Sequence, residues 1–491
     1  MTIKDLEPKG VWRNFDALSQ IPRPSKHEEK AEQFLLDWGK EHNVDVRRDE
    51  TGNIIFSKPA TPGYENRRGV ILQAHVDMVP QKTAETVHDF LKDPIQTQID
   101  GEWVTAKGTT LGADDGIGVC LALAVLEDNT LKHGPVEALI TYDEETGMTG
   151  AEKLKPGELK GDVLLNLDSE AEGELYIGCA GGLYGKADFE YKSMPAPAGY
   201  EAYRLSVKGL QGGHSGQDIV LYRANANKIV ARILLPLVEK YGVKVSDFVG
   251  GSLHNAIPFE ASADVLVPAG RVDEVKKIVE LVFAEVKAEY ADTDPSAACF
   301  FEKCDMPAAY CDMPAAYVED EVMQKAVKAI CACPSSVDRM SPVMHGLVET
   351  SVNMAVVRIQ DGHITVLSYL RSSVDSAKMD LAERMRCLFE LAGAQFTTYG
   401  AYSGWVPLPS TPVIATMKDV YKKLFGKDMK VTAIHAGLEC ALLGAKYPNW
   451  DMVSFGPTIL HPHSPDERVK IDTVDKCWEF LKAVLEAMPE K

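Results

Sequence analysis

The sequence is short of three features that would place it at a membrane or on a nucleic acid. No apolar run approaches the roughly 20 residues that cross a bilayer. The first residues, MTIKDLEPKGVWRNF, contain no apolar core of the signal-peptide type. Basic residues are outnumbered, 52 against 72 acidic ones, which gives a net charge of −20. We therefore expect no membrane partner, no nucleic-acid partner and a cytoplasmic location.

Cysteine is present, but its spacing suggests neither a disulfide framework nor a zinc knuckle. Ten cysteines are scattered along 491 residues, with one C-x-C at Cys331 and Cys333 and no C-x-x-C. In a chain of this length, free thiols in a reduced compartment are the better interpretation. The length also predicts two or more domains, each able to bury a core of its own.

Apolar segments of buried-strand length alternate with helical patterns in the first part of the chain. Three of them, GVILQAHVDMV, PVEALITYDEETG and DVLLNLDSE, end in acidic or imidazole residues, and GIGVCLALAVLED is an apolar helix. Strand, acidic tip and helix in repetition predict an α/β domain with a mainly parallel sheet. In such sheets a site forms where the strands end at their carboxyl tips.

The pattern changes near residue 183. AYRLSVKG, ANANKIVARILLPLVEKYG, SLHNAIPFEASADVLVP and VDEVKKIVELVFAEVKAEY read as strand, helix, strand and helix, and a similar order returns after Asp320. We expect an α/β domain built from residues 1–182 and 396–491, with residues 183–395 inserted as an α+β domain of two ferredoxin-like halves. CDMPAAY occurs twice in tandem between these halves, at 304–310 and 311–317, which predicts a loop.

Residues of the kind that bind metals gather at the predicted strand tips. His75 and Asp77 are two apart in QAHVD, so on a strand both face one way. The other tips contribute, in chain order, Asp114 and Asp115, then Asp143, Glu144 and Glu145, then Asp168, and finally His461 and His463. Taken singly, each of these groups also fits a solvated turn or a helix cap. Together, crowded carboxylates would repel one another unless a divalent cation were present, and mixed imidazole and carboxylate ligands suit zinc or manganese.

A set of motifs that runs over essentially the whole chain resembles one known family. The motifs are AHVDMVPQ, GTTLGADDGIG, DEETGMTGA, NLDSE, GGHSG, HNAIP, HAGLEC and PHSPDERV. The chain resembles the co-catalytic di-zinc peptidases of the aminoacylase and carboxypeptidase type, and within them it looks most like the bacterial aminoacyl-histidine dipeptidases. The resemblance implies that the α/β domain is the catalytic domain and that the inserted domain is its lid.

The resemblance also implies two Zn²⁺ ions, for which Mn²⁺ or Co²⁺ can substitute. Asp114 would bridge them with one carboxylate oxygen to each, and the peptide bond after Asp114 would be cis. His75 and Asp168 would complete one metal position, and Glu145 and His463 the other. His463 rather than His461 matches the family, because the ligand directly precedes Ser in the motif.

By the same resemblance, the remaining site residues divide between catalysis and substrate binding. Glu144 would be the general base for the attacking water, and Asp77 would hydrogen-bond the far nitrogen of His75. The expected substrate-binding residues are His214, Asn255, Arg371 and Gly437. His214 would stabilise the oxyanion, and Asn255 and Arg371 would bind the C-terminal carboxylate, although Arg371 also fits a solvated strand residue.

The implied function is hydrolysis of Xaa-His dipeptides, including those of the carnosine type, and of other dipeptides with broad tolerance. A dipeptide is thus the expected substrate, and the resemblance is compatible with a homodimer. A tripeptide aminopeptidase and an N-acyl amino-acid deacylase are alternatives that use the same metal centre. A non-catalytic protein of the same fold would have lost a ligand or the general base, and this sequence keeps all of the matched positions.

Overall fold

The computed structural model describes residues 2–304 and 316–491, which form two compact units. The first unit comprises Met1–Cys179, Trp405–Ala433 and Leu438–Lys491, and the second comprises Ala180–Gly404 and Ile434–Gly437. The domain boundaries that the sequence predicts, at 182/183 and 395/396, are not tested by this division and stay a prediction. Most of the tandem CDMPAAY repeat, and with it the predicted loop, lies outside the described residues.

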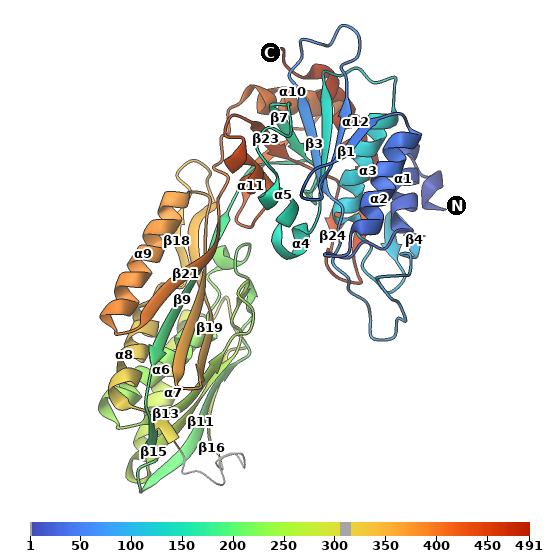
Figure 1. Cartoon of the computed structure of the whole chain (residues 1–491). Coiled ribbons are helices and arrows are strands. Elements are labelled where there is room, and N and C mark those ends of the chain that lie inside the picture. Colours follow the sequence, from blue (N-terminus) through green and yellow to red (C-terminus); the bar gives the residue numbers. More distant parts are fainter. Residues whose placement is uncertain (1, 305–315) are drawn as a thin grey trace. The chain divides into compact units, whose positions relative to one another are not determined.

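Eight strands form the main sheet of the first unit, in the order β1-β2-β6-β3-β7-β23-β8-β22 (Figure 1). They are β1 (Asp45–Arg48), β2 (Ile54–Lys58), β3 (Val70–His75), β6 (Val136–Thr141), β7 (Val163–Asn166), β8 (Glu174–Cys179), β22 (Lys430–Ile434) and β23 (Asp451–Ser454). The central strands β6, β3, β7 and β23 pair in parallel. Because β1, β2 and β8 pair antiparallel, the sheet has the predicted parallel centre with antiparallel strands beside it.

Helices cover both faces of this sheet (Figure 1). They are α1 (Lys9–Ser19), α2 (Glu29–Glu41), α3 (Ala113–Glu127), α4 (Glu144–Gly147), α5 (Thr149–Lys153), α10 (Pro412–Phe425), α11 (Glu439–Lys446) and α12 (Ile471–Ala487). α3 is apolar all round and is buried from Ala113 to Leu126, because it packs between β3 and α1. A smaller sheet joins β4 (Thr97–Asp100), β5 (Trp103–Ala106), β25 (Arg468–Lys470) and β24 (Ile459–Leu460).

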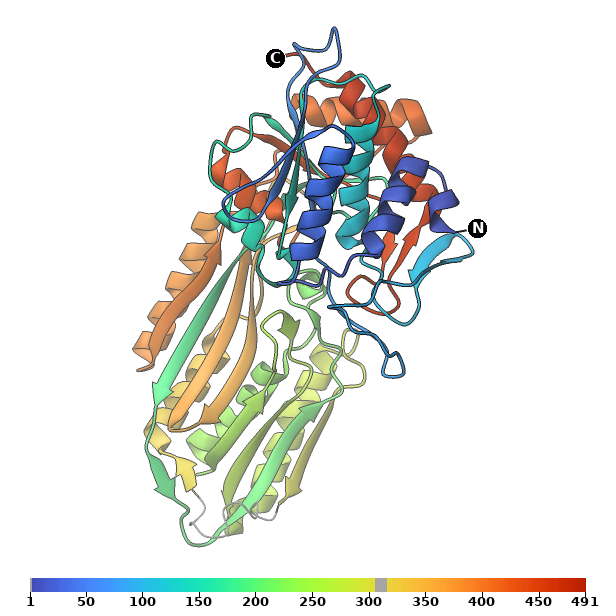
Figure 2. The same ribbon diagram turned by 45° about the vertical axis from the view of Figure 1, so that its right-hand side comes forward.

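The second unit is built on a nine-stranded antiparallel sheet with helices along one face (Figure 1, Figure 2). Its strands are β9 (Gly181–Glu190), β11 (Tyr200–Lys208), β13 (Lys244–Gly250), β15 (Ala261–Pro268), β16 (Ala298–Lys303), β18 (Ser336–Met340), β19 (Val348–Gln360), β20 (His363–Ser372) and β21 (Gln395–Tyr402). Its helices are α6 (Ala226–Lys240), α7 (Val272–Glu289), α8 (Asp320–Ala332) and α9 (Asp375–Leu391). Their apolar faces pack on the sheet and form one core with it.

Two ferredoxin-like halves make up this sheet, and one is nested inside the other. The inner half runs β11-α6-β13-β15-α7-β16, and the outer half runs β9-α8-β19-β20-α9-β21. The first strand of the outer half therefore precedes the whole inner half in the chain. The short strands β10 (Ser193–Pro195) and β17 (Ala316–Val318) pair where the chain leaves the outer half and returns to it. The halves join edge to edge through β13 and β19.

Two expectations about composition can be compared with the described residues. No helix in 2–304 or 316–491 is both long and apolar enough to cross a membrane. Eight of the cysteines in these ranges are free, at positions 120, 179, 299, 331, 333, 387, 440 and 477, which confirms the expectation of free thiols for these residues.

Candidate metal centre

The parallel strands of the first unit deliver three predicted ligands to one edge of the sheet. β3 ends at His75, β6 is followed within a few residues by Glu145, and β7 is followed by Asp168. Because β3 pairs in parallel with both β6 and β7, the carboxyl ends of the three strands meet. Asp77 lies beyond the end of β3 rather than on the strand, since β3 ends at His75.

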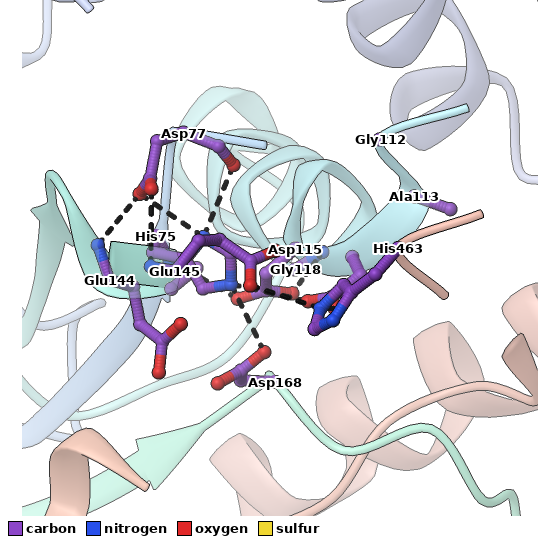
Figure 3. A network of polar contacts seen from close by, with 12 residues as sticks. His75, Asp77, Gly112, Ala113, Asp115, Gly118, Glu144, Glu145, Asp168 and His463 are labelled. Carbon is purple, nitrogen blue, oxygen red and sulfur yellow. Dashed lines mark hydrogen bonds and ion pairs between the residues drawn. The ribbon is translucent and has the colours of Figure 1, made fainter. Parts of the chain in front are cut away.

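The two carboxylate oxygens of Asp114 face two different groups of side chains. Oδ1 lies 3.2 Å from His75 Nε2, which is also 3.4 Å from Asp168 Oδ1. Oδ2 lies 3.0 Å from His463 Nε2, which is also 3.0 Å from Glu145 Oε2. Figure 3 shows the other four side chains converging from their separate elements. The five predicted ligands thus form two sets of three that share Asp114.

This donor set fits a divalent cation. Ligand atoms of His75, Asp114 and Glu145 all lie within 4.8 Å of one another, and Glu145 Oε1 is buried without a hydrogen-bond partner in the described chain. Burial raises the pKa of Asp168 to about 6. Burial lowers the pKa of His463, but its contacts with Asp114 and Glu145 outweigh this effect and raise it to about 11. Both raised pKa values mean that these side chains bind protons more tightly than usual in the metal-free protein, and a bound cation would take the place of those protons. Mixed imidazole and carboxylate ligands suit Zn²⁺ or Mn²⁺.

Asp77 orients both a histidine and the segment that carries the predicted general base. Its carboxylate Oδ1 lies 3.4 Å from His75 Nδ1, and its backbone carbonyl O lies 3.2 Å from the same nitrogen. The Asp77 carboxylate also accepts hydrogen bonds from the backbone N–H groups of Glu144 and Glu145, at 3.0 and 3.2 Å. Burial, with the Asp168 carboxylate nearby, raises the pKa of Glu144 well above its ordinary value. A carboxylate with a raised pKa is a stronger proton acceptor than an ordinary one, which is what a general base requires.

Asp115, the second aspartate of the pair, binds backbone groups instead. Its carboxylate accepts hydrogen bonds from the N–H of His75 at 3.3 Å and of Gly118 at 3.1 Å, so it ties the end of β3 to the first turn of α3. The peptide bond between Asp114 and Asp115 is cis, as expected. Gly112 has a φ of 70°, and a Cβ there would lie only 2.6 Å from Arg23 Nη2, so both the conformation and the space favour glycine.

Two buried residues that the sequence analysis missed hold the segment before Asp114. Glu467 accepts four backbone hydrogen bonds, at 2.7, 2.9, 2.7 and 3.2 Å, from the successive N–H groups of residues 111–114. Arg23 donates to the carbonyl oxygens of Gly112 at 2.6 Å and Val76 at 2.8 Å. Glu467 stands four residues after His463 in PHSPDERV, which was a usable signal. Arg23, between the two prolines of IPRPS, gave none.

Glu439, in the HAGLEC motif, lies beside the strand ends that carry the predicted ligands. It is fully buried, and its Oε2 accepts hydrogen bonds from Gln73 Nε2 at 2.6 Å and Thr141 Oγ1 at 2.7 Å. Asn166 Nδ2 donates to Gln73 Oε1 at 2.6 Å. Burial raises the pKa of Glu439 to about 7. These bonds link β3, β6 and β7 just before their ligand-bearing ends.

In the second unit, two of the four predicted substrate-binding residues, His214 and Arg371, lie against Gly216. His214 Nε2 lies 3.4 Å from Arg371 Nη2. A Cβ on Gly216 would overlap the carbonyl oxygen of His435, which belongs to the short segment that ends at Gly437. Burial and the Arg371 charge lower the pKa of His214 to about 4, so this imidazole is neutral at physiological pH.

Asn255 and Arg371 differ in their surroundings. β12 (Gly213–His214) pairs with β14 (Ala256–Ile257), which brings GGHSG beside HNAIP, and the carbonyl of Asn255 accepts a hydrogen bond from Ser215 N at 2.8 Å. The Asn255 side chain is exposed. Arg371 is buried against the Tyr369 ring, and its Nε has no hydrogen-bond partner within the described residues. A buried guanidinium with a spare N–H suits a planar anion such as a carboxylate.

Comparison with known proteins places this arrangement in a family. The model described as "Peptidase family M20/M25/M40" matches residues 71–487. The chain belongs to this peptidase family. It is 44% identical over 489 residues to the cytosol non-specific dipeptidase of Escherichia coli (strain K12), a match that covers 100% of this chain and 99% of that protein.

Solved structures agree with the family assignment. The aminoacylhistidine dipeptidase of Vibrio alginolyticus matches this peptidase with a TM-score of 0.92 and 48% identity, covering 100% of this chain and 99% of the other. Aminopeptidase PepT of Bacillus cereus matches with a TM-score of 0.57 and 15% identity, covering 98% and 99%, a likeness of fold alone. The family range contains every predicted site residue, from His75 to His463. This peptidase is therefore a hydrolase of peptide bonds.

Proposed function

We propose that this peptidase is a cytoplasmic dipeptidase that depends on two divalent cations and hydrolyses Xaa-His and other dipeptides. One observation carries the proposal. The two oxygens of Asp114 divide four further ligands into two sets, so a single carboxylate can bridge two cations. The names of the relatives from Escherichia coli and Vibrio alginolyticus supply the substrate class. Zn²⁺ is the proposed metal, with Mn²⁺ or Co²⁺ as substitutes.

In this proposal the five residues would hold two cations. His75 and Asp168 would complete one position with Asp114, and Glu145 and His463 would complete the other. Bound cations would supply Lewis-acid polarisation of the scissile carbonyl and of the attacking water.

Glu144 moves the proton. It accepts a proton from the attacking water and passes it to the amine of the leaving residue. Two observations support this role: the raised pKa of Glu144, and the hydrogen bond from its backbone N–H to Asp77, which fixes where the side chain begins. Asp77 also sits at the Nδ1 side of His75 and so favours the tautomer that leaves Nε2 free to bind metal.

The second unit provides the groups that recognise the substrate. His214, held neutral, would donate a hydrogen bond to the oxyanion that forms at the scissile carbonyl. Arg371 would bind the C-terminal carboxylate through its spare N–H, with Asn255 and the Gly437 backbone as further polar contacts. A substrate with a free C-terminal carboxylate follows from this assignment.

A substrate panel tests the proposal. The chelated protein is assayed on β-alanyl-histidine, alanyl-histidine, a histidine-free dipeptide, a tripeptide and an N-acetyl amino acid, with Zn²⁺, Mn²⁺ or Co²⁺ restored in turn. We expect activity to return with metal and kcat/KM to be highest for dipeptides. If the tripeptide or the N-acetyl amino acid is the best substrate, the protein is an aminopeptidase or a deacylase instead. Undiminished hydrolysis by the metal-free protein would contradict the metal-dependent mechanism.

A further inference from the structure

Glu467 binds four successive backbone N–H groups with one side chain. Its two carboxylate oxygens accept the backbone N–H groups of Leu111, Gly112, Ala113 and Asp114, two to each oxygen. The side chain is only 2% exposed, so these bonds replace its contact with water. Successive N–H groups that converge on one anion form a rigid backbone concavity, and hydrogen bonds to a charged acceptor are stronger than neutral ones.

The segment held in this way is the one from which the bridging carboxylate projects. Asp114 is the last of the four residues, so its backbone nitrogen is fixed directly by Glu467 Oε1. Arg23 holds the opposite side of the same segment through the carbonyl of Gly112, and it also donates to the carbonyl of Val76, beside His75. The segment is thus fixed by an anion on its N–H side and by a cation on its C=O side.

Glu467 is also linked to a ligand along the chain. It lies four residues after His463, and its own N–H donates to the carbonyl of Ser464 at 3.1 Å. Ser464 Oγ in turn donates to the carbonyl of His461 at 2.9 Å. The loop that presents His463 to Asp114 therefore also carries the group that fixes the backbone of Asp114.

We propose that Glu467 is a positioning residue, which sets the place of the Asp114 carboxylate relative to His463 and so determines how tightly the two cations are held. This role rests on the proposed metal-dependent function. It predicts an effect on metal affinity that goes beyond the effect on folding. The substitution Glu467→Gln keeps the shape but removes the charge, and its NH₂ end would face N–H donors where an oxygen now accepts them.

The experiment compares Glu467→Gln with a matched control. Asp294 is 1% exposed, and its two carboxylate oxygens accept the N–H groups of Gln211 and Ala224, both at 2.8 Å, in the second unit. Asp294→Asn therefore makes the same chemical change in a buried backbone-binding acid away from the metal ligands. We measure the Zn²⁺ dissociation constants by chelator competition, the visible spectrum of the Co²⁺-loaded protein, and the unfolding temperature of the metal-free protein.

We expect both variants to unfold at lower temperature, but only Glu467→Gln to bind metal about 10- to 100-fold more weakly and to change the Co²⁺ spectrum. Metal affinity within twofold of wild type in Glu467→Gln would overturn the proposal and leave Glu467 a structural residue. If Glu467→Gln does not fold, the test uses Glu467→Asp, which keeps the charge on a shorter side chain. Wild-type metal affinity in Glu467→Asp would equally overturn the proposal. A wild-type protein that binds no metal would instead reject the proposed function itself.

Discussion

At the scale of single residues, the two adjacent aspartates bind different partners. The carboxylate of Asp114 faces the imidazoles of His75 and His463, whereas that of Asp115 accepts backbone N–H groups at the start of α3. Their repulsion is reduced because the two carboxylates have separate sets of donors. The pair thus supplies one predicted ligand, Asp114, and one side chain, Asp115, that supports the strand carrying His75.

Substituting Glu144 separates proton transfer from metal binding. We expect Glu144→Gln to bind two metal ions per chain and to lose about 10²- to 10⁴-fold in kcat, because the general base is gone while the ligands remain. The neighbouring Glu145→Gln is the matched control, and we expect it to lose metal. The measurements are kcat and metal content after gel filtration. Equal metal loss in both variants would make Glu144 a ligand rather than the base.

The sequence was sufficient to predict which ligand-type side chains meet at the strand ends, but not the buried residues that hold the backbone beside them. His75, Asp168 and Glu145 were among the candidates because chemically distinctive side chains follow apolar strands, and the family resemblance selected them from that group. Glu467 acts on backbone N–H groups more than 350 residues earlier, and no residue type in that segment records the contact. Arg23 likewise binds only carbonyl oxygens. Backbone partners leave no compositional trace, so only the folded chain reveals them.

At the scale of elements, a buried histidine joins the short segment 434–437 to β19. His435 is 6% exposed, and its Nε2 lies 2.7 Å from Ser351 Oγ. Burial, with the charge of Arg371 nearby, lowers the pKa of His435 to about 3. The folded protein therefore keeps this imidazole neutral at a pH where the unfolded chain protonates it.

The stability of the second unit should consequently fall in mild acid. The imidazole of His435 takes up a proton in the unfolded state as the pH drops below about 6.5, but it stays neutral in the folded state. Its contribution to the free energy of unfolding is therefore complete above that pH and is lost progressively below it. We expect this group alone to cost about 2 kcal/mol of unfolding free energy between pH 7 and pH 5. Urea unfolding of wild type and His435→Gln, followed by circular dichroism, measures the difference. If the free energy of unfolding changes equally with pH in both proteins, the prediction is contradicted. The control is His27→Gln, a substitution at an exposed histidine, which should keep the wild-type pH dependence.

The element order was predicted better than the pairing. Strand and helix periodicities located both ferredoxin-like halves, but they predict that the second half begins after Asp320. Its first strand is in fact β9, which pairs with β20 and β21 after more than 170 intervening residues. The periodicity of apolar residues indicates which face of a strand is buried, but not which other strand it pairs with. The nested order of the two halves therefore cannot be predicted from periodicity alone.

At the scale of the whole molecule, tryptophan is confined to the first unit. All six tryptophans, at positions 12, 38, 103, 405, 450 and 478, fall within its three segments. Tryptophan fluorescence therefore reports the unfolding of the unit that carries the predicted metal ligands, whereas circular dichroism reports both units.

Metal removal should destabilise that unit selectively. A site occupied at a hundred times its dissociation constant adds about 2.7 kcal/mol, so chelation of two sites should lower the fluorescence-detected unfolding temperature by roughly 10 °C. In circular dichroism, which follows both units, we expect the transition of the second unit to stay at an unchanged temperature. Equal shifts in both signals would mean that the metals stabilise the chain generally, and no shift in fluorescence would contradict the metal centre.

The nested order of the second unit has a consequence for how such a protein can change over time. β10 and β17, which pair with each other, stand in the chain before and after the inner half. Beside them, Lys192 N donates to Glu319 Oε1 at 2.9 Å, and Glu319 N donates to the carbonyl of Lys192 at 3.2 Å. The two junctions of the inner half are therefore neighbours. A piece of chain with adjacent ends can be gained, lost or exchanged by one recombination event without redirecting the strands around it, so ancestral or shortened relatives are expected to differ at this junction.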